Sequence, residues 1–269
     1  MNFEAIINDS VNFTRDTLIG NPIRWLIFVL LGLPGGLLPF VFNFKDMSSR
    51  AAFDWKLVHW DQVIVLVCLM IIGSLLLSGY IVRIYRGGAV PPEFSQWAGM
   101  FLDGIKLCIV WLIWMVPAIV LLLASLATMF GAIFGGAKSA AGLGLLVLML
   151  ILLLASLVMM LVACIFGTIG AVRFARTGSI REGLHYREIL ATIERIGWWS
   201  YILAGIILFV IAIIFSVVSG IFSLIPFIGW VLDLAIAPLM SVLGARFLSL
   251  VYDAGVPPEP AVMLPAPDQ

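Results

Sequence analysis

Five stretches of this chain contain no charged side chain, and they are residues 25–44, 62–82, 107–137, 139–172 and 196–232. A helix needs about 20 mostly apolar residues to cross the hydrocarbon core of a bilayer, so each stretch is long enough to do so. Of the 269 residues, 63% are hydrophobic and 11% are charged, whereas a soluble domain has about a quarter charged residues. The sequence therefore predicts an integral membrane protein.

The last of these stretches is too long for one helix, because only Asp233 interrupts the apolar sequence before Arg246. Pro226 and Gly229 place a turn within it, since proline and glycine end helices. We therefore predict an all-α fold, a polytopic transmembrane helix bundle. Its six spans lie near residues 25–43, 62–84, 107–132, 145–172, 198–223 and 228–252. The run Pro34-Gly35-Gly36 predicts a kink or break in the first span, and Pro117 and Pro238 predict kinks in the third and sixth.

Lysine and arginine residues are distributed unequally between the two sides of this arrangement. Eleven lie on the side of the two termini, and four, Lys45, Arg50, Lys56 and Lys138, lie on the other. Because the short cytoplasmic segments of membrane proteins are enriched in these residues, both termini are expected to be cytoplasmic. The protein is expected in the cell (inner) membrane. The formal net charge is zero, so a nucleic-acid partner is not expected.

Three segments that end apolar stretches resemble one another. Residues 79–93 read GYIVRIYRGGAVPPE, residues 170–178 read GAVRFARTG, and residues 251–259 read VYDAGVPPE. They favour three parallel repeat units, about 1–86, 87–176 and 177–252, each an amphipathic helix followed by a helical hairpin. The membrane domain is then residues 1–252. Residues 253–269 are rich in proline, which predicts a disordered cytoplasmic tail.

Two of the segments that precede spans show the spacing of an amphipathic helix. Their apolar stripes are Phe94, Trp97, Phe101 and Ile105, and Tyr186, Ile189, Ile193 and Ile196. Pro91-Pro92 suits the first turn of the first helix, and Ser179 with Glu182 predicts a capping box before the second. Such helices lie in the membrane interface with their apolar face in lipid. The alternative is that they are loop helices that pack on protein.

Several of these segments resemble a known family. They are the GYIVRIYR run, the PPEFSQW segment, the FLDGIKL run and the HYREILATIERIGWW run. Together they are similar to the prokaryotic membrane proteins catalogued as domain of unknown function 4013, over about residues 10–252. This resemblance implies a polytopic membrane fold, and it implies no activity, substrate or cofactor.

The sequence contains no motif of a zinc protease or a serine hydrolase, and no metal site or cofactor is expected. One intramembrane acid, Asp233, is a candidate polar site, either as a proton or cation site or as a hydrated residue at the outer interface. Five arginines lie near the cytoplasmic ends of spans: Arg83, Arg86, Arg173, Arg176 and Arg246. They either fix the topology or form a basic ring that binds anionic lipid head groups.

These features favour a non-enzymatic membrane protein. It is expected to organise or bind lipid head groups or a partner protein, including a second copy of itself, through its cytoplasmic amphipathic helices. The alternative is a transporter or channel. Since the spans offer few polar side chains for a hydrophilic solute, its substrate would be a lipid or another apolar molecule.

Overall fold

The computed structural model describes residues 1–41, 59–135, 139–225 and 229–255, and every regular element in these ranges is helical. The elements are α1 (Phe3–Thr14), the π-helical turn η1 (Arg15–Ile19), α2 (Pro22–Val41), α4 (Trp60–Tyr85), α5 (Trp97–Phe134), α6 (Ala140–Thr177), α7 (Ile180–Gly183), α8 (Tyr186–Ile196), α9 (Trp198–Ser223) and α10 (Gly229–Asp253). The all-α prediction is confirmed for this part of the chain. Residues 256–269 of the predicted tail lie outside it.

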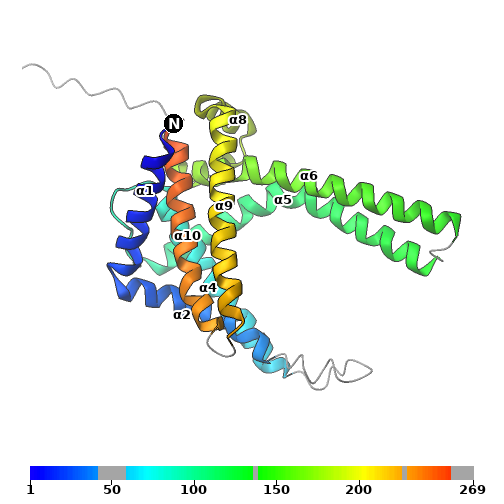
Figure 1. Ribbon diagram of the computed structural model, residues 1–269, viewed down its shortest axis with the longest axis horizontal. Coiled ribbons are helices and arrows are strands. Elements are labelled where there is room, and N and C mark those ends of the chain that lie inside the picture. Colours follow the sequence, from blue (N-terminus) through cyan, green and yellow to red (C-terminus); the bar gives the residue numbers. More distant parts are fainter. Residues whose placement is uncertain (42–58, 136–138, 226–228, 256–269) are drawn as a thin grey trace, which may run out of the picture.

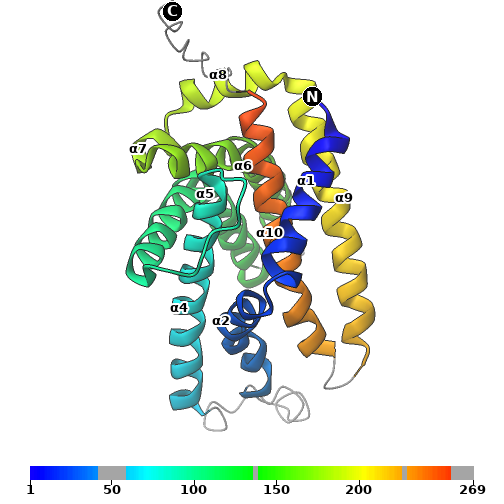
Figure 2. The same ribbon diagram turned by 90° about the vertical axis from the view of Figure 1, so that its left-hand side faces the viewer.

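Long helices that follow one another in the chain pack together: α2 with α4, α4 with α5, α5 with α6, and α9 with α10. The α5–α6 pair projects sideways from the other helices as an arm (Figure 1). Helix α10 packs against both α1 and α9 and lies between them in Figure 1. Figure 2 shows α1 in front, running along α10. The chain is thus a set of consecutively packed helices from which the α5–α6 arm diverges.

Five helices are long and apolar enough to cross a membrane: α4, α5, α6, α9 and α10. A sixth candidate is the bent pair of residues 3–19 and 22–38, whose two parts meet at 84°. The prediction of a multi-pass membrane protein is therefore confirmed. Helices α5 and α6 have 38 residues each. At 1.5 Å per residue each is about 57 Å long, so each extends beyond a hydrocarbon core of about 30 Å.

The predicted break in the first span is wrong in position. Helix α2 runs without interruption from Pro22 through Pro34, and the chain bends before it, at Gly20 and Asn21. Pro22 occupies the first turn, where a backbone N–H is not required. Proline is tolerated within membrane helices because neighbouring groups compensate for the missing hydrogen bond. Pro117 and Pro238 likewise lie inside the continuous helices α5 and α10.

The separate amphipathic helix predicted before the third span is also absent. Helix α5 is continuous from Trp97, and Pro91-Pro92 lies in the preceding loop. The protein-facing side of this first part is formed by Met100, Gly104 and Leu107 rather than by the predicted stripe. Phe94 precedes the helix and stacks on Tyr80 with 4.5 Å between ring centroids. This face packs on α4, whereas Trp97 of the predicted stripe is exposed.

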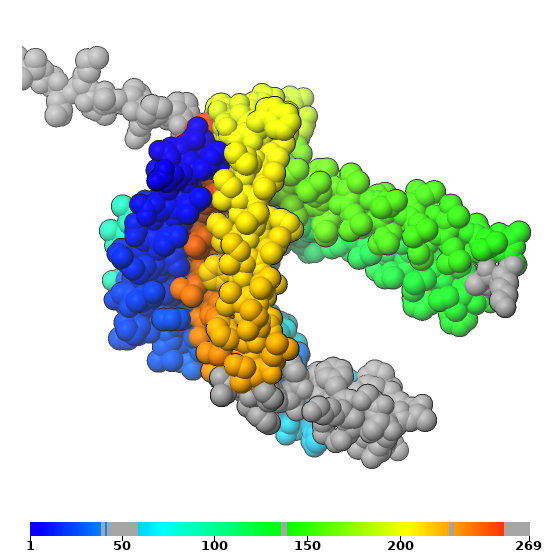
Figure 3. Space-filling model, in the orientation of Figure 1, coloured from blue at the N-terminus to red at the C-terminus, as the bar shows by residue number. Residues whose placement is uncertain are grey.

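The buried side chains gather where α4, α6 and α10 end, in residues 79–85, 167–175 and 242–252. We call this region the junction. Within it α4 and α5 cross closely, because a Cβ at Gly79 would collide with the Met100 carbonyl and one at Gly104 with the Leu75 carbonyl. Away from the junction the large exposed side chains of the arm are mostly leucine, isoleucine and valine. Figure 3 shows the arm as a projection from the rest of the surface. In a bilayer this surface faces lipid.

The close crossing of α4 and α5 predicts that Gly79→Ala destabilises the protein. The added methyl group has no space against the Met100 backbone, so we expect a loss of about 2 kcal/mol in the free energy of unfolding. The measurement is the unfolding temperature of the detergent-solubilised protein, followed by tryptophan fluorescence. Gly205→Ala in α9 is the matched control, because nothing lies within 4 Å of the new atom. Equal unfolding temperatures for both variants would contradict the crossing.

Candidate functional site

Helix α8 follows the junction and packs its apolar face on protein. Ile189 and Ile193 are completely buried, and a Cβ at Gly170 of α6 would lie 3.3 Å from Ile189 Cδ1. The expectation that this face enters lipid is therefore wrong, and the alternative that the helix packs on the bundle is confirmed for α8. The predicted capping box is also wrong. Ser179 makes no side-chain cap, and Glu182 pairs with Arg173 instead.

Arg83 and Arg86, at the end of α4, hold the loop that follows. The Arg83 guanidinium donates hydrogen bonds to the carbonyl oxygens of Glu93 and Ser95, both at 2.7 Å. Arg86 Nη2 pairs with Asp103 Oδ2 of α5 at 2.6 Å. These two side chains fix the loop across the start of α5.

Arg173 connects the end of α6 to both short helices. Its Nη2 lies 2.7 Å from Glu182 Oε2 of α7 and 3.7 Å from Glu188 Oε2 of α8. The hydrogen bond from Arg173 lowers the pKa of the Glu182 carboxyl, because it stabilises the charged form. Arg173 therefore uses its charge to hold α7 and α8 in place.

Arg176 and Arg246 lie on the two sides of the Gly87-Gly88 turn. Arg176 donates two hydrogen bonds to Asp253, at 2.7 and 2.9 Å, and its guanidinium occupies the space that a side chain at Gly87 would need. Gly87 also has φ of 74°, which favours glycine. On the other side, Arg246 Nη1 donates to the Gly88 carbonyl at 2.8 Å.

Arg246 is the most deeply buried of the five arginines, at 7% exposure. Its Nε pairs with Asp9 Oδ1 of α1 at 2.7 Å, and its guanidinium lies over the Phe13 ring, 4.7 Å from the centroid. It thus joins the first helix, the turn after α4 and the last helix. Each of the five predicted arginines has a hydrogen-bond or ion-pair partner within the protein, so these residues link helix ends and loops to one another.

Asp233 lies near the turn between α9 and α10. Its Oδ2 accepts a hydrogen bond from Ser223 Oγ at 3.0 Å, which joins the two helices. Its Oδ1 is buried and has no hydrogen-bond partner within the described residues. The structure therefore places Asp233 in an interhelical contact.

The sequence interpretation missed the basic residues that keep their charge available. Within the described ranges, the lysine and arginine side chains without an ion pair or a hydrogen bond to protein are Arg24, Lys106, Arg181, Arg187 and Arg195. The sequence pattern does indicate that Arg187 and Arg195 are exposed, since both lie off the apolar stripe of their helix. What the sequence did not show is which arginines find carboxylate partners in the fold.

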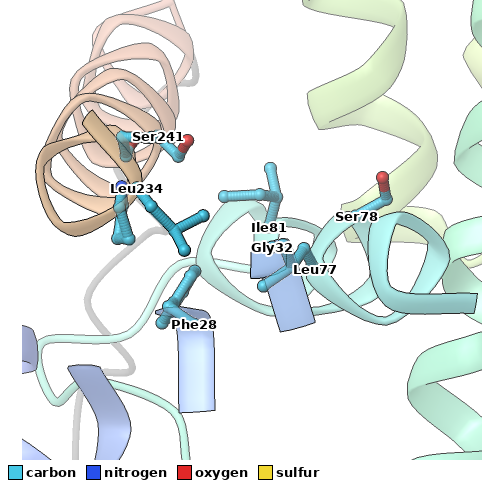
Figure 4. A pocket seen from close by; sticks show the side chains of 9 residues that line it. Phe28, Gly32, Leu77, Ser78, Ile81, Leu234 and Ser241 are labelled. Carbon is cyan, nitrogen blue, oxygen red and sulfur yellow. Dashed lines mark hydrogen bonds between the residues drawn. The ribbon is translucent and has the colours of Figure 1, made fainter. Parts of the chain in front are cut away.

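A pocket of about 220 Å³ lies between α2, α4 and α10 (Figure 4). Its wall is mostly apolar, with two serine hydroxyls, Ser78 and Ser241. Asp233 is not among the lining residues. No group of three histidine, cysteine or acidic side chains that could hold a metal ion occurs in the described part of the chain.

A family model described as "Protein of unknown function (DUF4013)" matches residues 63–225. The match begins in α4 and ends just after α9, and it includes the arginines of α4 and α6 and the whole α5–α6 arm. No curated protein and no solved structure matches the chain.

The buried position of Arg246 predicts that Arg246→Met releases α1 from the bundle. The substitution leaves the half-exposed Asp9 carboxylate and the Gly88 carbonyl without their donor, which should cost about 1.5 kcal/mol of unfolding free energy. Hydrogen exchange of residues 3–14 should increase more than that of α9. Arg15→Met is the control, because the Arg15 side chain is 64% exposed. Unchanged exchange of α1 in Arg246→Met would refute this role.

The Arg173–Glu182 pair predicts a dependence of α7 on pH. The folded-state pKa of Glu182 is lowered, so its contribution to stability is present above the unfolded-state value and is lost as pH falls through the folded value. Hydrogen exchange of residues 180–196, corrected for intrinsic exchange, should therefore rise as pH falls below about 4.3, the ordinary pKa of glutamate. Glu182→Gln should remove this acid-dependent change. An identical pH profile in the variant would count against the pair.

Proposed function

We propose that this chain, which belongs to the DUF4013 family, is a non-enzymatic membrane protein that binds anionic lipid head groups at the basic end of its bundle. The binding surface is residues 181–199, which comprise the end of α7, all of α8 and the first turn of α9. The observation that carries the proposal is that Arg181, Arg187 and Arg195 are exposed and have no ion-pair partner among the described residues.

The charge balance of this surface supports an anionic ligand. The segment contains three arginines and three glutamates. Two of the glutamates, Glu182 and Glu188, lie against Arg173 of α6, at 2.7 and 3.7 Å. Glu194 is therefore the one carboxylate left without such a partner in this segment. Counted together with Arg173, this surface has four arginines and three glutamates and so a net charge of +1. An Arg or Lys near an anionic membrane surface contributes about 1 kcal/mol of attraction.

Aromatic side chains beside these arginines support a position at the membrane interface. Trp199 is 85% exposed and Tyr186 is 56% exposed, although both are large. Tryptophan and tyrosine favour the head-group region, where the ring contacts apolar material and the polar atom contacts water. Exposed aromatic rings next to unpaired arginines are suited to a lipid surface.

The proposed orientation puts this surface and both termini on the cytoplasmic side, as the distribution of lysine and arginine predicts. Helices α4, α6 and α10 all end at the junction, each with arginines near that end. This arrangement is compatible with three units of about residues 1–86, 87–176 and 177–252. We propose that the units are parallel repeats whose ends are joined by the arginine contacts.

A second candidate function is transport of a lipid. The pocket between α2, α4 and α10 favours it, because its apolar wall suits an acyl chain and not a hydrophilic solute. Binding at residues 181–199 does not require the lipid to move across the membrane. Transport requires movement of lipid between the two leaflets, which reconstituted protein in vesicles with a labelled lipid would reveal.

The binding surface predicts the lipid preference of the purified protein. Wild-type protein should retain phosphatidylglycerol in preference to phosphatidylcholine, as measured by native mass spectrometry from mixed micelles. The triple variant Arg181→Gln, Arg187→Gln, Arg195→Gln should lose most of this preference, because each arginine contributes about 1 kcal/mol. High salt should weaken the wild-type preference, since surface charges are screened.

The matched control for this experiment is Glu194→Gln, which removes the remaining carboxylate of the surface. It should strengthen retention of phosphatidylglycerol. A triple variant that keeps the wild-type preference would refute the proposed function.

A further inference from the structure

The walls of the pocket between α2, α4 and α10 include a glycine, Gly32, and a proline, Pro238. Gly32 has no side chain to fill it, and a Cβ there would lie 2.9 Å from Leu234 Cδ1. Pro238 lies inside α10 and cannot donate to the carbonyl one turn before it, which weakens regular helix packing there. Phe28, Ile81 and Leu234 point toward the same space from three helices (Figure 4).

One basic residue lies on the pocket face of α2. Arg24 precedes Phe28 by four residues, and Phe28 precedes Gly32 by four, so all three lie on one side of the helix. Phe28 and Gly32 line the pocket. Arg24 is partly buried, and no acidic side chain of the described residues lies within ion-pair distance of it.

Arg24 lies one helical turn before the lining residue Phe28 and is itself not among the lining residues. Tyr80 packs edge to face on Phe28, with ring centroids 5.0 Å apart, and its hydroxyl is within electrostatic range of Arg24. Trp25, the next residue, donates its indole N–H to the Ala235 carbonyl of α10 at 2.8 Å. The start of α2 is thereby fixed against α10, with the backbone of Arg24 one turn from the pocket residue Phe28.

An apolar pocket with a cation at one end is complementary to an amphiphile with a negative head group. A hydrophilic anion would leave the apolar wall unused, and a neutral hydrocarbon would leave Arg24 without a partner. The bilayer around the protein supplies anionic phospholipids, and a chain that enters between helices meets mostly apolar side chains. Charged hydrogen bonds to phosphate are among the stronger polar contacts.

We propose that this pocket binds one anionic phospholipid, with part of an acyl chain between α2, α4 and α10 and the phosphate at Arg24. This site is separate from the surface of residues 181–199 and uses different residues. A lipid whose chain is enclosed between helices is less sensitive to salt than one held by surface charge, because screening acts on the head group alone.

The test counts phosphatidylglycerol molecules that remain on the detergent-solubilised protein in native mass spectrometry after a wash in 1 M salt. Wild-type protein should retain one. Arg24→Gln should retain it about tenfold less well, since a charged hydrogen bond contributes about that factor, whereas Arg24→Lys should retain more than Arg24→Gln. Arg15→Gln is the matched control, because this exposed arginine is outside the pocket.

A second variant acts through the pocket wall. Ala237→Leu adds a side chain to a lining position that is exposed on α10, and it should displace the acyl chain while Arg24 remains. Retention of the lipid at the wild-type level by both Arg24→Gln and Ala237→Leu would overturn the proposal. The triple arginine variant of residues 181–199 should retain this one lipid, so the two sites are tested separately.

Discussion

The contacts of one buried guanidinium, that of Arg246, determine how the ends of this chain meet. It joins Asp9 of the first helix, 237 positions earlier, and the Gly88 carbonyl, 158 positions earlier. Burying an unpaired charge is very costly, so the arrangement is stable only when these partners are present. The position of α1 along α10 and that of the turn after α4 both follow from this requirement.

The neighbouring arginines also connect helix ends through ion pairs and hydrogen bonds. Arg176 binds Asp253 and occupies the space beside Gly87, and Arg173 binds Glu182. Charges that compensate each other inside the protein attract little from outside. The candidate for lipid binding therefore moves from the arginines at the ends of spans to those on α7 and α8, together with Arg24 at the pocket.

The membrane-spanning helices could be predicted from the sequence, because such a helix needs only sufficient length and low charge. The predicted span 198–223 has the bounds of α9, and residues 62–84 lie within α4. The prediction of which helix face contacts lipid failed for α8, because tertiary packing determines which face is buried. The stripe of Ile189 and Ile193 has the same spacing whether it faces lipid or protein, since both are apolar. Its burial against α6 became visible only in the fold.

The sequence by itself determined the class of the protein, five of its apolar helices and the gathering of arginines at their ends, because these depend on composition and spacing along the chain. The tertiary structure decided which arginines are paired, where α1 lies and which face of α8 is buried. These properties depend on residues far apart in sequence, such as Arg246 and Asp9. Such pairings arise from three-dimensional packing, which one-dimensional periodicity does not encode.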